Sequence, residues 1–174
     1  VAVFGVGPVG LGSVLLQSSL GRRVIAIDRS AVRLELARRL GAREVVNVDQ
    51  TPPADAVREL TDGAGADVCI EAAGRPETAL ACFDAVRIAG TVVFNGEQGA
   101  VPLSPSEHFI RRDVTAVGAW FYHFSEYPAM LACYRQGLRL RELITDQFPF
   151  TEAAAAYAKF AAGQTGKVLL RFTE

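Results

Sequence analysis

Residues 1–21 of this 174-residue chain, VAVFGVGPVGLGSVLLQSSLG, decide the fold. The apolar run at 1–4 predicts a buried strand, and the apolar spacing that follows predicts a helix over 8–20. A strand that enters a helix through a GxGxxG turn is typical of a pyrophosphate-binding unit. The first glycine permits a tight turn, the second lets the backbone approach a phosphate, and the third lets the helix pack close to the strand. These glycines are Gly5, Gly7 and Gly10.

The start of the expected helix completes this prediction. The first helical turn presents N–H groups that have no intrahelical acceptor, together with the positive end of the helix dipole, and both attract phosphate. Pro8 and Val9 lie in this turn. Proline is tolerated there because its missing N–H would have no intrahelical partner in any case.

An acid at the end of the second expected strand, residues 23–28, extends the motif to a whole dinucleotide. Asp28 follows Gly10 at close to the roughly 20 residues that separate the glycine loop from a ribose-binding acid. The alternative interpretation is a turn residue ahead of Ser30, a candidate helix N-cap. A carboxylate accepts hydrogen bonds from a ribose 2′-OH and repels a 2′-phosphate, so Asp28 favours NAD over NADP. Arg29 and Arg33 act against this preference, because a guanidinium attracts phosphate.

Short Val- and Ile-rich strands alternate with helical segments over most of the chain. This alternation predicts a parallel sheet with helices on both faces. Right-handed crossovers then give an α/β doubly wound Rossmann fold with six strands. Strands are expected at 1–4, 23–28, 44–48, 66–74 (with its turn), 91–96 and 113–121, and helices at 8–20, 30–41, 51–63, 76–90, 106–111 and 125–137.

The last part of the sequence has a different pattern. After a break around residues 137–141, residues 143–172 predict a strand, a helix and a strand that do not add one further unit to the alternation. We therefore expect a dinucleotide-binding domain at 1–137 and a C-terminal segment at 138–174 that packs outside the six-stranded sheet.

Composition excludes several classes of partner. The net charge is −1, from 18 basic and 19 acidic residues, which gives no electrostatic footprint for nucleic acid or an anionic membrane. No apolar run approaches the roughly 20 residues of a membrane-spanning helix. The three cysteines, Cys69, Cys82 and Cys133, form neither a disulfide framework nor a metal-ligand pattern, and a reducing cytoplasm is the expected compartment.

At this point the motifs resemble a known family. The segments VFGVGPVGL, VIAID, RLELARRLGA and DVCIEAAG, with the tail LITDQFPFTEAAAAYAKFAAGQTGKVLLRF, resemble the zinc-type medium-chain alcohol and polyol dehydrogenases over essentially the whole chain. In that family an N-terminal domain carries the zinc ligands, a nucleotide domain follows, and the tail returns to complete the catalytic domain. The resemblance implies that this chain is a fragment without the zinc-binding half, and no cysteine or histidine in it matches a family zinc ligand.

The resemblance also implies specific cofactor contacts. Asp28 matches the ribose-binding acid and Arg33 a basic residue that reaches the adenosine ribose. Lys167 matches a basic position near the pyrophosphate, and a solvated surface lysine is the alternative. The remaining matches lie in turns that follow strands. After the fourth strand, Ala72, Ala73 and Arg75 would lie beside the adenine and ribose. After the fifth and sixth strands, Asn95, Gly96, Glu97, Ala119 and Trp120 would give backbone groups to the nicotinamide.

The aromatic stretch AWFYHFSEY at 119–127 has two interpretations. It could be a wall that faces the substrate or the nicotinamide, but packing in the core around the last helix is favoured. His123 has no partner acid at a recognisable spacing, so it is not predicted to be a general base.

For the intact enzyme the resemblance implies NAD-dependent hydride transfer to or from a small alcohol or polyol, with zinc as a Lewis acid. The present chain is expected to bind NAD weakly and to catalyse nothing. A homodimer or homotetramer is expected, because AVPLSPSEHF at 100–109 resembles the family's pairing region. Three alternatives remain: a zinc-free NADPH quinone or enone reductase, against which Asp28 argues; a non-catalytic NAD-sensing domain, against which the tail argues; and a methyltransferase, against which Phe4 argues.

Overall fold

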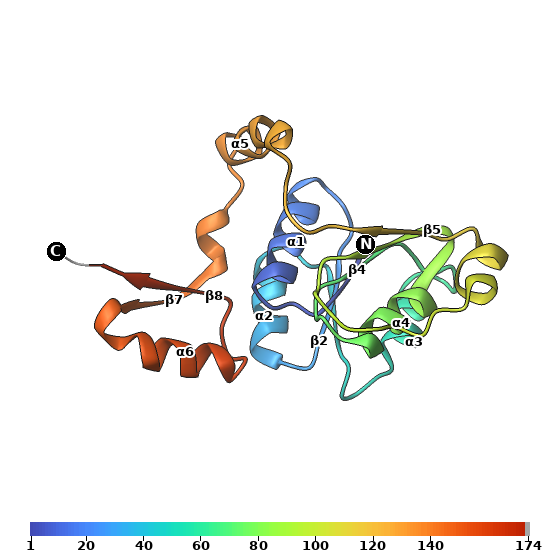
Figure 1. Ribbon diagram of the computed structural model, residues 1–174, viewed down its shortest axis with the longest axis horizontal. Coiled ribbons are helices and arrows are strands. Elements are labelled where there is room, and N and C mark those ends of the chain that lie inside the picture. The colour runs from blue at the N-terminus through green and yellow to red at the C-terminus, as the bar shows by residue number, and fades with distance from the viewer. Residues whose placement is uncertain (173–174) are drawn as a thin grey trace.

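The computed structural model describes residues 1–172 and contains a six-stranded parallel sheet with the strand order β3-β2-β1-β4-β5-β6 (Figure 1). The doubly wound fold is therefore confirmed. The strands of this sheet are β1 (Ala2–Phe4), β2 (Ile25–Asp28), β3 (Glu44–Asn47), β4 (Ala66–Glu71), β5 (Val86–Phe94) and β6 (Thr115–Gly118). The helices along this part are α1 (Pro8–Ser19), α2 (Ala31–Arg39), α3 (Pro53–Leu60) and α4 (Pro76–Ala85), followed by the short turns η1 (Pro105–Phe109) and η2 (Ile110–Arg112).

The hydrophobic core lies on both faces of the sheet, because successive side chains of a strand point to opposite faces. Phe4 and Ile27 pack on one face with Val57 and Phe83 of α3 and α4. On the other face, Val3 and its neighbours pack with residues of α1 and α2, including Leu11, Val14, Leu34 and Leu36. The central strands are consequently buried on both sides, and their carboxyl ends all meet at one edge of the sheet.

The predicted N-cap of α2 is confirmed, and the helix ends at Arg39 with Leu40 as its C-cap, just before Gly41. The Ser30 hydroxyl accepts a hydrogen bond from Arg33 N at 3.4 Å, as an N-cap does. Gly41, just beyond the helix, has a φ of +107°, the left-handed conformation that ends helices and that glycine adopts without strain.

The boundary between α4 and β5 differs from the prediction. The helix was expected to continue to residue 90, but it ends at Ala85 and residues 86–90 already belong to β5. Val86 pairs with Ala66 of β4, and Arg87 forms an ion pair with Asp67 at 2.6 Å. Pairing with the neighbouring strand therefore overrides the local helix pattern. The sixth strand is also shorter than expected.

The C-terminal part forms its own small unit beside α2 (Figure 1). Strands β7 (Ile144–Pro149) and β8 (Lys167–Arg171) pair in parallel, joined through α6 (Ala153–Ala161). The predicted strand, helix and strand are confirmed, and they do not extend the larger sheet. The Ser30 hydroxyl donates to Gly163 O at 3.3 Å and Arg33 Nε to Thr165 O at 3.2 Å, which ties this unit to the start of α2. The connecting chain contains η3 (Phe124–Glu126), α5 (Tyr127–Arg135) and η4 (Leu140–Leu143), and η5 (Phe150–Glu152) precedes α6.

The C-terminal segment expected at 138–174 ends in Thr173 and Glu174, which lie outside the described residues. Among residues 1–172, no helix combines the length and apolar character needed to cross a bilayer.

Candidate dinucleotide site

Two of the three glycines in the loop are required by close packing of the backbone. Gly5 has a φ of +85°, and a Cβ built on it would lie 2.6 Å from the Cβ of Ala73. A Cβ on Gly10 would lie 1.9 Å from the carbonyl oxygen of Gly5 and 3.4 Å from the side chain of Val3. The turn and the close approach of α1 to β1 therefore exclude a side chain at both positions.

The middle glycine is different, because the protein itself leaves room there. The nearest atom to a Cβ built on Gly7 is Arg33 Nη1, at 3.8 Å, and the φ of Gly7 is −68°, which any residue can adopt. Neither backbone strain nor packing within the chain requires glycine at this position. A ligand that approaches the backbone would give such a requirement.

The N-terminus of α1 has the character of an anion site. Gly7 is its N-cap, no side chain caps it, and its first turn contains no acidic residue. The first hydrogen bond of the helix runs from Leu11 N to Gly7 O at 2.8 Å. The N–H groups of Val9 and Gly10 precede this bond and so have no intrahelical acceptor, while the helix dipole adds positive potential.

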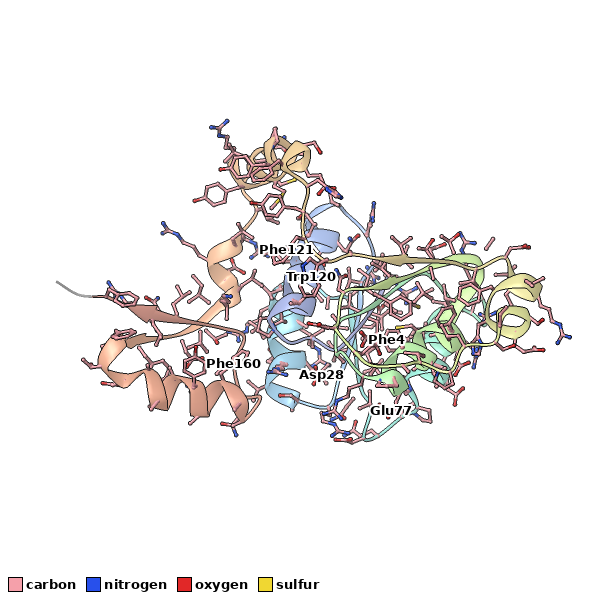
Figure 2. The ribbon with its side chains drawn as sticks, viewed as in Figure 1. Phe4, Asp28, Glu77, Trp120, Phe121 and Phe160 are labelled. Carbon is pink, nitrogen blue, oxygen red and sulfur yellow. The ribbon has the colours of Figure 1, made fainter. Side chains whose placement is uncertain are left out.

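Asp28 lies next to this loop at the end of β2 (Figure 2). Its Oδ2 accepts a hydrogen bond from Val6 N at 2.8 Å, and its Oδ1 accepts from Arg29 N at 2.8 Å and Ser30 N at 2.9 Å. Three backbone donors therefore fix the carboxylate between the glycine loop and the start of α2. Each carboxylate oxygen has two lone-pair directions, so Oδ2 keeps capacity for a further donor.

The two arginines after Asp28 point to different places. The Arg29 guanidinium lies 3.7 Å from the Asp49 carboxylate, in the loop after β3. Arg33 lies between the glycine loop and the C-terminal unit, because its guanidinium is near Gly7 and its Nε donates to Thr165 O. Of the two, Arg33 is the one that borders the site.

The turns after β4, β5 and β6 lie along the same carboxyl edge. Ala72 N donates to Phe4 O at 2.8 Å, and Asn95 N donates to Glu71 O at 2.8 Å. Ala119 N donates to Phe94 O at 2.9 Å, and the Asn95 side-chain amide reaches Ala119 O at 3.4 Å. The sheet therefore brings the sequence-predicted turn residues into one row: Ala72, Ala73, Arg75, Asn95, Gly96, Glu97, Ala119 and Trp120.

Glu71, the last residue of β4, was missed by the sequence interpretation. Its side chain is fully buried, and its carboxylate accepts hydrogen bonds from the turn after β4 and from Gln98 after β5. The available signal was an acid directly after the apolar run at 68–70, since a buried carboxylate requires dedicated donors.

Lys167 lies beside the start of α1, although it belongs to β8. It lines a cavity of about 400 Å³ between α1 and the C-terminal unit, with Pro8, Val9, Ala156, Tyr157, Phe160, Val168 and Leu170. Figure 2 marks Phe160 in this unit. The apolar lining from α6 has no counterpart in the sequence motifs. A hollow of about 690 Å³ lies at the opposite edge of the sheet, where Arg23 and Glu44 form an ion pair at 2.9 Å.

The expectation that the aromatic stretch packs in the core is wrong. Trp120 and Phe121 are 74% and 75% exposed, and Phe124 is 92% exposed. Figure 2 shows Trp120 and Phe121 near the point where the chain leaves the sheet towards α5. β6 is the last strand of its sheet and is exposed along its length, so nothing within residues 1–172 covers the segment that follows it.

The described residues do not provide a metal site. No group of three His, Cys, Asp or Glu side chains within residues 1–172 is close enough together to hold an ion. Burial raises the pKa of the Cys69 thiol to about 12 and that of Cys82 well above its usual value, so neither is a ready thiolate ligand.

Comparison with known proteins identifies the family. The model of the zinc-binding dehydrogenase family matches residues 8–136. L-threonine 3-dehydrogenase of Paraburkholderia phymatum is 30% identical over 175 residues, which cover 99% of this chain and 51% of that protein. The alcohol dehydrogenase TADH from Thermus sp. ATN1 superposes with a TM-score of 0.89 at 31% identity, over 99% of this chain and 50% of that one. A short chain alcohol dehydrogenase from Escherichia coli CFT073, solved with NADH, gives a TM-score of 0.86 at 26% identity, over 98% and 51%.

The chain belongs to the zinc-binding dehydrogenase family. It spans about half the length of the curated relatives it matches. The relatives named above are dehydrogenases, and the family implies a nicotinamide dinucleotide as cofactor.

Proposed function

We propose that this chain binds NAD and, within the intact protein, orients the nicotinamide for hydride transfer to or from a small alcohol, polyol or amino alcohol. The observation that carries the proposal is the arrangement of two groups side by side. The N-terminus of α1 has no side-chain cap and adjoins Gly7, where the chain leaves room for a ligand, and the Asp28 carboxylate is held next to it by backbone hydrogen bonds. The phosphates would meet the N–H groups of Val9 and Gly10, and the adenosine ribose would donate to Asp28. The other proposed contacts are Gly5, Gly7, Pro8, Arg29, Arg33, Ala72, Ala73, Arg75, Asn95, Gly96, Glu97, Ala119, Trp120 and Lys167.

When bound, NAD supplies the nicotinamide carbon that accepts or gives the hydride. The residues of this chain would orient the nicotinamide and line its surroundings. Backbone groups after β5 and β6 would bind the carboxamide, while Val9, Tyr157 and Phe160 give the cavity between α1 and the C-terminal unit an apolar lining. Residues 1–172 bring no set of zinc ligands together.

The two parts of the chain have different proposed roles, and residues 1–137 are proposed to bind the dinucleotide. Residues 138–174 would pack on the catalytic part of the intact protein, which fits their separate two-stranded sheet. The isolated chain is then expected to form no NADH when it is given an alcohol and NAD. Alcohol-dependent absorbance at 340 nm from the purified chain would contradict this division.

We also propose that two copies pair through the exposed edge of β6, because the strand is uncovered and residues 100–109 resemble the pairing region of the family. Light scattering at high concentration should then give twice the mass of one chain, and a strict monomer would refute the pairing. The free buried thiols are compatible with a reducing compartment, and we propose the cytoplasm.

NADP is the second candidate cofactor, because Arg33 borders the site with a guanidinium that could meet a 2′-phosphate. A calorimetric titration of the chain with NADH and NADPH separates the two. Asp28 predicts tighter binding of NADH, since its charge repels a 2′-phosphate. Equal or tighter binding of NADPH would indicate that Arg33 binds the 2′-phosphate and that NADP is the cofactor.

The glycine loop gives a variant that tests binding without disturbing the fold. In Gly7→Ala the new methyl group has room in the free chain but would lie where the backbone should meet the phosphates. We expect unchanged thermal stability and NADH affinity lower by about tenfold, an order of magnitude for loss of one close phosphate approach. The matched control is Gly12→Ala on the same helix, where a Cβ meets nothing within 4 Å; its affinity should stay that of the unmodified chain.

A further inference from the structure

We propose that Glu71 is a positioning residue, whose single buried carboxylate fixes two of the proposed cofactor-contacting loops relative to each other. The inference rests on the proposed function and extends it. It concerns the turn at 72–75, after β4, and the loop at 95–98, after β5.

The carboxylate connects three stretches of chain. Its Oε1 accepts hydrogen bonds from Ala73 N at 3.0 Å, Gly74 N at 3.0 Å and the Thr78 hydroxyl at 2.6 Å. Its Oε2 accepts from Gln98 Nε2 at 3.2 Å and is 3.3 Å from Gly74 N. The turn after β4, the first turn of α4 and the loop after β5 are thus held by one group.

The backbone of Glu71 adds a second link to the same loop. Its carbonyl oxygen accepts from Asn95 N at 2.8 Å and from Gly96 N at 2.9 Å. The two loops are also in direct contact, since a Cβ built on Gly96 would lie 2.4 Å from Gly74 N and 2.5 Å from Glu71 Oε2. The carboxylate therefore lies at the contact between the two loops.

The side-chain amide of Gln98 is oriented by the Glu71 carboxylate. Its nitrogen faces the carboxylate, and its Oε1 is buried with no hydrogen-bond partner among the described residues. An unpaired buried acceptor is unfavourable, but the reversed amide would set Oε1 against Glu71 Oε2. Glu71 itself is fully buried and its side-chain hydrogen bonds come only from neutral donors, so these donors replace the water that a carboxylate needs.

The strand order tells which part of the cofactor depends on this link. With the adenosine ribose at Asp28 on β2 and the pyrophosphate at α1, after β1, the other half of a dinucleotide extends towards β4 and β5. The loop after β5 would therefore meet the nicotinamide half and not the adenosine half. Loosening this loop should weaken NADH binding more than ADP binding.

Two variants test the link. Glu71→Gln keeps the side-chain volume but replaces Oε2, which accepts from Gln98, by an NH2 group that cannot accept. Reversal of the Gln98 amide would restore a hydrogen bond there, but the new NH2 group would still lie close to Gly74 N–H, a second donor. Gln98→Leu removes only the hydrogen bond between the carboxylate and the loop after β5, and it leaves the hydrogen bonds to the turn after β4 intact. Cys82→Ala is the control, because Cys82 is equally buried, lies on α4 and takes no part in the network.

The measurement is calorimetric titration of each variant of the whole chain with ADP and with NADH, beside its thermal unfolding midpoint. We expect Gln98→Leu, which alters only the contact to the loop after β5, to weaken NADH about threefold and to change ADP affinity less than about twofold. Glu71→Gln also loosens the turn at 72–75, which is proposed to lie beside the adenine and ribose, so it should weaken NADH about tenfold and ADP by a clearly smaller factor. Cys82→Ala should lower the unfolding midpoint and leave both affinities unchanged. If Glu71→Gln does not fold, Gln98→Leu carries the test.

The inference is overturned if Gln98→Leu and any folded Glu71→Gln bind NADH as the unmodified chain does. It is equally overturned if they weaken ADP and NADH by the same factor, since a purely structural role would do that. Failure of the unmodified chain to bind either nucleotide would instead refute the proposed function.

Discussion

Asp28 has two roles at the scale of single residues. It is proposed to hold the ribose, and it also joins the glycine loop to β2 through Val6 N and starts α2 through Arg29 N and Ser30 N. Cofactor preference and local folding therefore depend on the same carboxylate. A substitution intended to change the first will also change the second.

Asp28→Asn removes the negative charge of this side chain and keeps its shape. The amide keeps the side-chain size but sets an NH2 group against Val6 N–H, which leaves a donor unpaired at a cost of about 1–3 kcal/mol in the free energy of unfolding. NADH affinity should fall, and NADPH affinity should fall less because repulsion of the 2′-phosphate is removed. Urea unfolding and calorimetry measure both effects. Asp49→Asn, which removes only the exposed partner of Arg29, is the control and should change neither.

At the scale of elements, α1 is positioned by the absence of a side chain at Gly10. Gly10→Ala would push α1 away from β1, because its Cβ meets the carbonyl oxygen of Gly5 at 1.9 Å. We expect a loss of about 3 kcal/mol or more, comparable with severe overpacking of a core. Gly12→Ala, two residues along the same helix, should be neutral or stabilising by up to about 1 kcal/mol. Equal thermal midpoints for the two variants would show that α1 does not pack on β1 in this way.

The C-terminal unit contains an ion pair with a definite pH dependence. Asp146 on β7 contacts Lys159 on α6 and accepts from the Thr145 hydroxyl at 2.7 Å. The hydrogen bonds from Lys159 and Thr145 lower the pKa of Asp146 below its usual 3.8. A lowered pKa stabilises the folded state above the unfolded pKa, and this contribution is lost as the pH falls through the folded pKa.

Asp146→Asn should therefore destabilise α6 at neutral pH by up to about 1 kcal/mol, the range of a partly exposed pair. The difference from the unmodified chain should shrink as the pH falls below about 4. Hydrogen exchange of the α6 amides at several pH values measures this. A difference that stays constant from neutral pH down to about pH 3 would show that the carboxylate charge is not responsible.

At the scale of the whole molecule, the fold was predictable because each unit carries its own local signal. The glycine loop fixed the first strand and helix, and the continuous apolar strands indicated a parallel sheet. The end of α4 was not predictable, because pairing of Val86 with Ala66 decides it and such pairing leaves no local pattern. The exposure of Trp120 was missed for a related reason, since aromatic content alone does not tell whether a covering element exists.

The candidate site was predictable to a similar extent. Asp28 and the glycines have a fixed spacing, so their neighbourhood follows from the sequence. Glu71 has no such spacing, and its role depends on donors that the fold brings from residues 73–98. The position of Lys167 beside Val9 depends on how the C-terminal unit lies against α1, which no short motif encodes.

A crystal structure of the chain soaked with NADH tests the central claim most directly. The account predicts pyrophosphate oxygens at about 3 Å from the N–H groups of Val9 and Gly10, with the adenosine ribose hydroxyls on Asp28 Oδ2. A dinucleotide bound elsewhere, or bound at α1 with its ribose away from Asp28, would contradict it.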